Sequence, residues 1–509
     1  MAELSAGVAA VIVLAAGSGT RMKSAKSKLL HKVGGRSLLS WAVDTAVSVQ
    51  PEHLVVVVGQ MRDQVEAHLD EIAPTAVRAV QDAPRGTGHA VQCGLAALDE
   101  VEGEVVVTYG DVPMLSGRAL GDLVSAHRED GNAVTVLTAL VDDPTGYGRV
   151  LRDGEQVMAI VEHRDASPEQ LTIHEINAGI YVFDAQVLRQ GLAQLQSDNA
   201  QGELYLTDLV GYARSLGGRV GAQIEADVWQ TVGVNDRVQL AQMDHEMNRR
   251  IVRDWMLAGV TVIEPATTWI ERSVSLEPDV EIHPDTVLRG ATTVASGAVI
   301  GPSTRLTDVE VGERAQVCRS EATLAVIGPD AVVGPFSYLR PGTQLGAKGK
   351  IGAFVEAKNA QIGTGSKVPH LTYCGDAVIG EGSNIGAGTI FANYDGVNKA
   401  TTTIGSHSFI GSDSVLVAPV AIADGAYVAA GSVVTRPVGP GELAVARERQ
   451  RNIPQWVTRA RANTAAAVAA ANALAAAQAA VAADATTPAA SPDPAVPPVS
   501  SPQQPKEQA

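Results

Sequence analysis

The 509-residue sequence is poor in aromatic residues and cysteine, and acidic side chains outnumber basic ones. Phe, Trp and Tyr make up 4% of the chain against 45% hydrophobic residues overall, which favours aliphatic packing and, with 50 glycines, many tight turns. Cys93, Cys318 and Cys374 are far apart and form no CxxC pair, so we expect reduced thiols rather than disulfides or a zinc site. A net charge of −17 argues against nucleic acid or an anionic membrane as main partner.

Long apolar runs are also scarce. The run at 6–17 follows Glu3 and no basic residue, so we interpret it as a fully buried parallel strand rather than a signal peptide. No later segment is expected to be long enough to span a bilayer. The sequence therefore predicts a cytoplasmic protein.

Residues 1–235 alternate short apolar runs with amphipathic stretches, which predicts βαβ units and a mainly parallel, Rossmann-like sheet. The expected strands lie at 11–16, 54–59, 104–110 and 133–140, and the expected helices at 37–49 and 63–72. Residues 236–258 lack Pro and Gly and predict one long helix within a linker, 236–262. Ligands of such sheets bind beyond the carboxyl ends of the strands.

From residue 263 to 446 an aliphatic residue, usually followed by glycine, recurs every six positions. The two clearest runs are Ile327, Val333, Leu339, Leu345 and Ile351, and Ile404, Ile410, Leu416, Ile422, Val428 and Val434. This period fits neither a helix nor an alternating strand and is typical of the hexapeptide repeats of a parallel β-helix, with aliphatics inside a three-sided coil. The phase slips between 352 and 403, where we expect 367–376 and 392–401 to bulge outward as loops.

Residues 447–509 form a C-terminal arm and tail. An alanine-rich stretch favours a transient helix, and the Pro, Ser and Gln-rich remainder is expected to be disordered. We assign this tail no chemistry.

Polar residues follow the predicted strands where phosphate chemistry requires them. Gly17 and Gly19 suit a tight anion-binding turn, with Arg21 and Lys28 as cations. No GKS or GKT closes this loop, and on its own it also fits an ordinary strand–helix turn. Asp111 ends an apolar strand and suits Mg²⁺, although a lone aspartate there is more often a helix N-cap.

Seven segments in order remove this ambiguity: LAAGSGTRM, GTGHA, YGDVP, DPTGYGR, NAGIYVF, ELYLTD and VGVNDR. With the repeats, the chain resembles bacterial bifunctional N-acetylglucosamine-1-phosphate uridylyltransferases and glucosamine-1-phosphate acetyltransferases over residues 8–458. The resemblance implies an α/β nucleotidyltransferase domain followed by a left-handed parallel β-helix. It implies that the nucleotide and its phosphates contact Leu14, Ala15, Ala16, Gly17, Gly19, Arg21, Lys28, Gln81, Gly86 and Thr87. It also assigns the amino sugar to Gly148, Glu162, Asn177 and Asn235, and Mg²⁺ to Asp111 and Asn235.

Two positions depart from the family pattern. Ser27 replaces the usual proline before the loop lysine, and Arg85 replaces an aliphatic residue before GTGHA. Because Ser27 removes a restraint on φ, we expect a looser loop. Neither change removes a contacting group, so the reaction is expected to be retained.

The repeat region contains a second group of polar residues, in LRPGTQLG, FVEAKNA, PHLTYCGD and ANYDGVNK. Acyl transfer from a thioester to an amine needs a base, oxyanion donors and a phosphate clamp. His370, expected on an irregular loop, is the candidate base, although a lone histidine is usually only solvated. Cys374 is interpreted as a packed side chain rather than a nucleophile.

For this half, the resemblance implies further contacts. The sugar phosphate is assigned to Arg340, Lys358, Tyr373, Asn384 and Lys399, and acetyl-CoA to Ala387, Asn393, Tyr394, Ser412, Ala430 and Arg447. The Ala387 N–H is assigned to the oxyanion as well. The family forms homotrimers with this site where subunits meet, and the open faces of a single β-helix fit that assembly.

Three alternatives remain open. A single-activity sugar nucleotidyltransferase could carry a β-helix for assembly alone, but a scaffold needs neither the His370 segment nor the NYDG loop. A trimeric zinc lyase uses three histidines, whereas His283, His370 and His407 lack the required spacing. A non-catalytic scaffold leaves the Gly17, Asp111 and Asn235 group unexplained.

Overall fold

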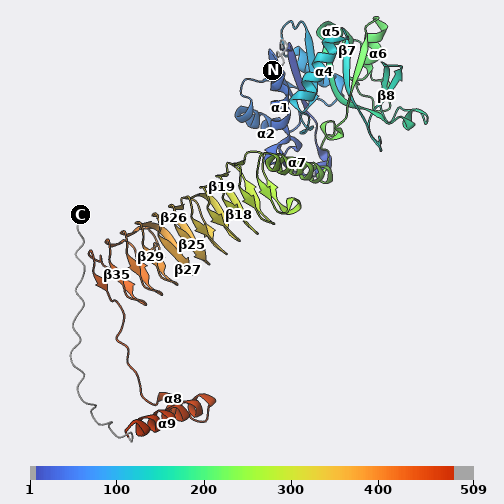
Figure 1. Ribbon diagram of the computed structural model, residues 1–509. Helices are drawn as coiled ribbons and strands as arrows, with labels where there is room; N and C mark the ends of the chain where they lie inside the picture. Colours follow the sequence, from blue (N-terminus) through green and yellow to red (C-terminus); the bar gives the residue numbers. More distant parts are fainter. Residues whose placement is uncertain (1–6, 486–509) are drawn as a thin grey trace, which may run out of the picture. The chain divides into compact units, whose positions relative to one another are not determined.

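The computed structural model describes residues 7–485. The chain divides into two compact units, Met1–Ala446 and Arg447–Ala509, and each is considered by itself. The larger unit begins with an α/β part built on one mixed sheet and continues into stacked coils of short strands (Figure 1).

The sheet of the α/β part has seven strands along its main path, in the order β11-β7-β10-β6-β1-β4-β5. Its strands are β1 (Ala10–Ala15), β4 (His53–Val58), β5 (Val77–Val80), β6 (Glu104–Tyr109), β7 (Val134–Leu140), β10 (Glu175–Asp184) and β11 (Val220–Glu225). All neighbours on this path pair in parallel except at β10, which is antiparallel to both β6 and β7. The apolar run near the N-terminus forms the buried central strand β1, as predicted.

Alternation along the strands divides the core into two layers. Ile12 and Val57 face one hydrophobic cluster and Val11 and Val56 the other, since successive side chains of a strand point to opposite faces. The first cluster includes residues of α3 (Thr87–Ala96), α5 (Ala185–Leu192) and α6 (Asp208–Ser215). The second includes residues of α1 (Leu38–Ser48), α2 (Arg62–Ile72) and α4 (Gly117–Glu129). The sheet is therefore covered by helices on both faces.

The predicted linker helix is α7 (Arg237–Leu257). Its N-cap is Asp236, whose carboxylate accepts hydrogen bonds from the backbone N–H groups of Val238 and Gln239. Met247 and Ile251 are buried in one cluster with inward residues of the first β-helix coils. This cap places Asn235 immediately before the helix.

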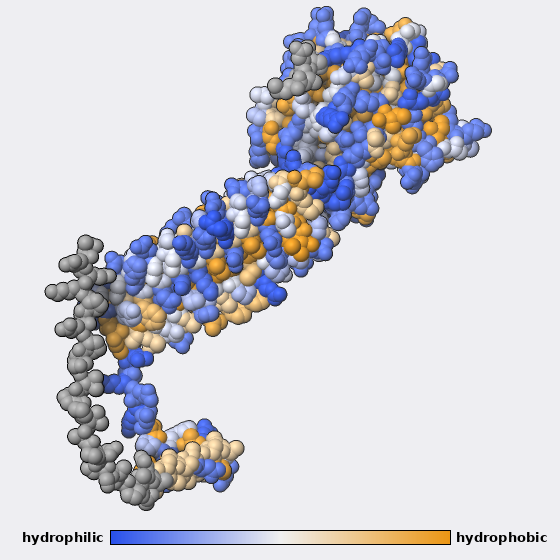
Figure 2. Space-filling view, viewed as in Figure 1, coloured by the Kyte–Doolittle hydropathy of each residue, from blue (hydrophilic) through white to orange (hydrophobic). Residues whose placement is uncertain are grey.

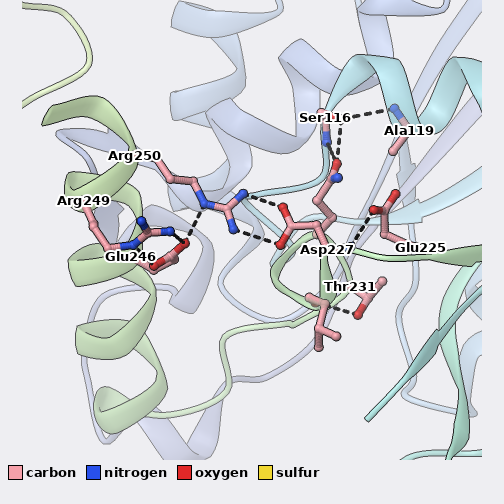
Figure 3. Close-up of polar contacts among 10 residues, drawn as sticks. Ser116, Ala119, Glu225, Asp227, Thr231, Glu246, Arg249 and Arg250 are labelled. Atoms are coloured by element: carbon pink, nitrogen blue, oxygen red, sulfur yellow. Dashed lines mark hydrogen bonds and ion pairs between the residues drawn. The ribbon is translucent and has the colours of Figure 1, made fainter. Parts of the chain in front are cut away.

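Ion pairs fix α7 to the segment that follows β11. The Arg250 guanidinium donates to both carboxylate oxygens of Asp227, at 2.5 and 2.9 Å, and also bonds Glu246 (Figure 3). The hydrogen bond from Arg250 is the main reason why the pKa of Asp227 is lowered. Hydrogen bonds from Arg249 and Arg250 lower the pKa of Glu246 to about 2. These pairs hold the chain on either side of the turn that presents Asn235.

Beyond α7 the chain winds into a parallel β-helix. One sheet of eleven strands runs from β12 (Thr261–Val262) to β37 (Leu443–Ala444), and a second of fifteen strands forms the rest of the wall. The aliphatic residues of both hexapeptide runs are buried, with Ile351, Ile410 and Leu416 fully inaccessible. Cys374 is also fully buried, and burial raises the pKa of its thiol to about 12, in agreement with its predicted packing role. The prediction of inward-facing aliphatics is confirmed.

Residues with positive φ stack in columns at the corners of the coils. We call two of these columns corner A and corner B. Corner A comprises Ser303, Arg319, Phe336, Phe354, Leu371, Gly388, Asp413 and Gly431, each with its backbone N–H bonded to the preceding coil. Corner B comprises Asp308, Leu324, Gly342, Asn359 and Asp376. Each column is a line along which successive coils present equivalent positions.

The prediction of two loops is wrong for 367–376 and correct for all of 392–401 except Ala392, which ends a strand. The first segment contributes β27 (Lys367–His370) and β28 (Tyr373–Ile379), both paired with neighbouring coils, with corner A at Leu371 between them. The phase slips because the inward residues Cys374 and Ile379 are five positions apart, so this side is shortened at corner B. Residues between β30 (Ile390–Ala392) and β31 (Thr402–Ile404) do leave the coil, and Tyr394 and Lys399 form a bridge across the excursion.

In the smaller unit, the alanine-rich stretch forms α9 (Ala465–Ala485), after α8 (Trp456–Ala460). The expectation that no later segment could span a bilayer is wrong in length and composition, because 18 residues, Ala465–Ala482, have a mean hydropathy of 1.6. Only 6% of that window is buried. The rest of the predicted disordered tail lies outside the described residues.

Candidate active sites

A cavity of about 320 Å³ opens at the carboxyl ends of β1 and β6. Among the predicted nucleotide and metal residues, its lining includes Leu14, Ala15, Ala16, Gly17, Lys28, Gln81, Gly86, Thr87 and Asp111. The cavity therefore lies where open α/β sheets bind their ligands.

Lys28 and Asp111 both line this cavity and form an ion pair with each other. Both side chains are largely buried, with exposed fractions of 11% and 18%. Arg21 and Asn235 are not among the residues that line the cavity, and Arg21 donates to Asn235 Oδ1 at 2.9 Å. The backbone of 233–234 lies against Asp111, because the Val234 N–H donates to the Asp111 carbonyl at 2.9 Å.

These residues fit a magnesium ion in the form that proteins usually bind it. Mg²⁺ takes oxygen ligands, keeps several waters and commonly uses one or two protein groups together with substrate phosphates. Asp111 and Asn235 carry a carboxylate and an amide oxygen on adjoining segments, and these groups accept hydrogen bonds from Lys28 and Arg21. Within residues 7–485, no group of three or more His, Cys, Asp or Glu side chains could hold a metal ion by itself.

Three of the four predicted amino-sugar residues, Gly148, Glu162 and Asn177, are also brought together. A Cβ atom added to Gly148 would lie 3.6 Å from Glu162 Cδ and 3.6 Å from Asn177 Cβ, so the three positions adjoin. Burial, aided by the charge of Asp165, raises the pKa of Glu162. The structure therefore places a half-buried carboxyl group beside Gly148 and Asn177.

Four residues that line the cavity were not predicted from the sequence: Gln60, Asp82, Tyr109 and Glu203. Of these, Tyr109 has the clearest structural constraint. Its ring lies over Gly179, where an added Cβ would come within 2.3 Å of the ring and where φ is +78°. Gly179 is thus required by both conformation and close approach. The motif NAGIYVF includes Gly179, but the sequence alone did not show that this glycine makes room for the Tyr109 ring.

The second group of predicted residues lies on the β-helix around corners A and B. His370 is the exposed last residue of β27, next to corner A, and not part of an irregular loop as expected. Its carbonyl accepts the Gly388 N–H at 3.3 Å, so the Ala387–Gly388 turn lies on the following coil. Asn384 begins β29 (Asn384–Ile385), which pairs with β27.

Arg340, Lys358 and Tyr373 lie on the side between the two corners, and Lys399 lies on the excursion. Arg340 donates to Glu356 Oε1 at 2.8 Å, and Glu356 is the ladder partner of Tyr373. Lys358 adjoins Lys399, and this contact and the charge of Lys399 lower the pKa of Lys358. Two adjacent ammonium groups favour an anion between them.

Asn359, Asp376 and Asn393 form a chain of side-chain hydrogen bonds next to these cations, and the first two lie at corner B. Asp376 accepts hydrogen bonds from Asn359 Nδ2 at 2.8 Å and from Asn393 Nδ2 at 2.5 Å. Burial raises the pKa of Asp376, but the two amides and the charges of Lys358 and Lys399 outweigh it and lower the pKa overall. Asn393 is buried at the base of the excursion, and Tyr394 is exposed on it.

Three of the six positions predicted for acetyl-CoA stack along corner A. The Ala387 carbonyl accepts the Asp413 N–H at 2.7 Å, and the Ser412 carbonyl accepts the Gly431 N–H at 2.8 Å. Ala387, Ser412 and Ala430 therefore occupy equivalent positions on successive coils. Arg447 is exposed and belongs to the smaller unit.

Comparison with known proteins links these two sites. Residues 11–199 match the MobA-like NTP transferase domain, and residues 401–436 match the bacterial transferase hexapeptide repeats. The bifunctional protein GlmU of Kineococcus radiotolerans is 56% identical over 463 residues, covering 91% of this chain and 94% of that protein. GlmU proteins of Streptomyces coelicolor and Mycolicibacterium vanbaalenii are 55% and 57% identical, covering 91% and 90% of this chain and 96% and 94% of those proteins.

The chain belongs to the bifunctional GlmU family. Its departure at Ser27 has a structural counterpart in two hydrogen bonds that join the loop to α2. Ser27 is buried with φ at −53°, and its N–H donates to Gln64 Oε1 at 2.9 Å. Gln64 Nε2 donates in turn to the Ala25 carbonyl at 3.0 Å. A proline lacks this donor, so α2 holds the loop here by hydrogen bonds instead.

Arg85, the second departure from the GlmU pattern, is exposed. Its carbonyl accepts the Leu204 N–H at 2.8 Å, a backbone contact that any side chain permits. The structure gives no reason for an arginine at this position.

Proposed function

We propose that the chain catalyses two steps of UDP-N-acetylglucosamine synthesis. Glucosamine-1-phosphate is first acetylated by acetyl-CoA, and the product then accepts the uridylyl group of UTP with release of pyrophosphate. The observation that carries this proposal is the family match over 91% of the chain, together with two separate polar sites. We propose domains at 1–235 and 263–446 for the two activities, a linker at 236–262 and an arm and tail at 447–509.

In the uridylyl step, a phosphate oxygen of the sugar phosphate attacks the α-phosphorus of UTP in line. A new P–O bond forms as the bond to pyrophosphate breaks, and no strong base is needed because the nucleophile is already an anion. Lys28 and Arg21 neutralise phosphate charge, while Gly148, Glu162 and Asn177 hold the amino sugar. Asp111 and Asn235 would hold Mg²⁺, which supplies further charge neutralisation at the phosphates when bound.

In the acetyl step, the amine of glucosamine-1-phosphate attacks the thioester carbonyl. A C–N bond forms, the C–S bond breaks, and the sulfur leaves as the thiol of coenzyme A. His370 takes the proton from the amine, and the Ala387 N–H donates to the oxyanion. Arg340, Lys358 and Lys399 hold the phosphate, with Tyr373 and Asn384 beside them.

We further propose that the chain acts as a homotrimer in the cytoplasm. Phe336, Phe354 and Leu371 stack along corner A with 52%, 60% and 61% of their surface exposed, and the two phenyl rings lie 5.4 Å apart. Exposed apolar clusters of this kind mark protein contacts. Apolar patches among polar side chains are also visible on the surface of the β-helix (Figure 2). His370 adjoins this column, so a neighbouring subunit could close the acetyl site.

Separate assays on one preparation test the two-site proposal. Asp111→Ala should abolish pyrophosphate release from UTP and leave thiol release from acetyl-CoA nearly intact, and His370→Ala should do the reverse. Loss of both activities in either folded variant contradicts two independent sites. A wild-type protein that releases pyrophosphate but no thiol supports the single-activity alternative.

Assembly is tested by Phe354→Glu, which places a charge in the proposed contact. Light scattering should show a smaller species, with acetyl transfer lost and uridylyl transfer kept. Val397→Glu on the exposed excursion is a matched control that should leave the mass unchanged. An unchanged mass for Phe354→Glu refutes corner A as the subunit contact.

A further inference from the structure

Gln81 in the nucleotide cavity is held by two neighbours that fix which way its amide points. Its terminal nitrogen lies 3.1 Å from the Gly86 carbonyl oxygen and 3.2 Å from His89 Nδ1. A carbonyl oxygen can only accept, so the atom that faces Gly86 must be the NH₂ group. Both N–H bonds of Gln81 Nε2 are then used inside the protein.

The same contact fixes the tautomer of His89. The NH₂ group of Gln81 cannot accept a hydrogen bond, so His89 Nδ1 must accept, and in the neutral ring the proton lies on Nε2. Nε2 faces Cys93 Sγ at 3.7 Å, one helical turn further along α3. Burial, followed by the charge of Asp82, raises the pKa of the Cys93 thiol, which therefore remains a neutral, weak acceptor.

This arrangement leaves Gln81 Oε1 as an acceptor in the cavity wall. No residue in 7–485 donates a hydrogen bond to this oxygen, and Gln81 is part of the lining. Uracil has an N–H donor at N3, whereas cytosine has a lone pair there. An outward-facing acceptor therefore bonds the first base and repels the second.

We infer that His89 is a positioning residue that sets the uracil preference of the uridylyl site by fixing the Gln81 amide, with Cys93 holding the His89 ring. This rests on the proposed function, in which UTP is the nucleotide. The backbone supports the same geometry: Gly86 has a φ of +101°, and an added Cβ would lie 2.6 Å from the Leu204 carbonyl. The Gly86 carbonyl therefore has a fixed place opposite Gln81.

The test compares binding of UTP and CTP by titration calorimetry in the full chain. His89→Leu removes one of the two acceptors that hold the amide and should lower the ratio of UTP to CTP affinity about two- to tenfold, the value of one net hydrogen bond. His89→Asn can place its Oδ1 near the position of Nδ1 and should restore much of the ratio. Cys93→Ala should have a smaller effect in the direction of His89→Leu.

His53→Leu serves as the matched control, because His53 is exposed at the start of β4, outside the cavity lining. Both affinities are measured on one preparation, so an unfolded fraction lowers the fitted stoichiometry for both nucleotides and leaves the ratio of affinities unchanged. A ratio in His89→Leu equal to that of wild type overturns the inference. Absence of pyrophosphate release by wild type contradicts the proposed function instead, while the binding ratio still decides the role of His89.

Discussion

Replacing Asp376 by Asn should weaken binding of the sugar phosphate at the acetyl site and leave uridylyl transfer unchanged. Asp376 accepts hydrogen bonds from Asn359 and Asn393, one coil below and at the base of the excursion. An asparagine offers one oxygen, so one of the two amide donors would face another NH₂ group. The excursion that includes Lys399 would then lose its anchor on corner B.

The size of the effect follows from two opposing terms. A hydrogen bond to a charged acceptor contributes about 1.5–3 kcal/mol. Removing the negative charge of Asp376 also favours the incoming phosphate, but Asp376 is only half-buried, so water weakens this second term. The loss of anchoring is larger, so we expect the KM for glucosamine-1-phosphate to rise by about tenfold, which corresponds to about 1.4 kcal/mol.

Release of coenzyme A thiol at varied glucosamine-1-phosphate concentration measures this KM, and pyrophosphate release checks the other site. The kcat should change by less than about threefold, because His370 lies beyond corner A on a different side of the coil. Asp424→Asn is the control, since Asp424 also bonds a neighbouring coil, through the Ser406 N–H, at another corner. An unchanged or lower KM in Asp376→Asn would refute the anchoring role.

Three further changes test other parts of the structure. Gln64→Leu should raise the KM for UTP, measured by pyrophosphate release, about two- to tenfold because it removes the hydrogen bonds to Ser27 and Ala25. The same change should have a smaller effect in a Ser27→Pro background, and equal effects in both backgrounds would contradict a role of the Ser27–Gln64 hydrogen bond. Because burial raises the pKa of Glu162, its contribution to stability is present below the ordinary glutamate pKa and is lost as the pH rises through the raised value. Glu162→Gln should therefore raise the melting temperature at pH 8 but not at pH 4, while uridylyl transfer slows; equal shifts at both pH values would count against this account. Ile410→Ala should cost about 2–5 kcal/mol in urea unfolding because Ile410 is fully buried, and a loss below about 1 kcal/mol would show that the coil collapses around the gap.

The sequence predicted the structure correctly where a regular spacing of aliphatic residues determines which side chains are buried. The six-residue recurrence predicted the inward positions of Ile351 and Ile410 because the shape of the coil repeats along the chain. Apolar runs located β1 and β6, and the residues that follow them line the cavity because parallel strands end at one edge. These features depend on local order along the chain.

The sequence was insufficient where contacts join distant segments. The hydrogen bond between Ser27 and Gln64 spans 37 positions, and the sequence did not predict it because the partner lies on another helix. The chain of hydrogen bonds through Asn359, Asp376 and Asn393 becomes visible only when three coils are stacked. Shortened coil sides also escaped prediction, because a five-residue step resembles an interruption of the repeat.

The excursion at 393–401 begins and ends at neighbouring points of the coil. The strand before it, β30, pairs with β33 (Val415–Val417), and the strand after it, β31, pairs with β34 (Val420–Ile422). Later coils therefore keep their stacking whatever the length or composition of this segment. Substitutions or insertions in this exposed segment can therefore change which acetyl acceptor is bound, while the stacked strands that support it stay the same.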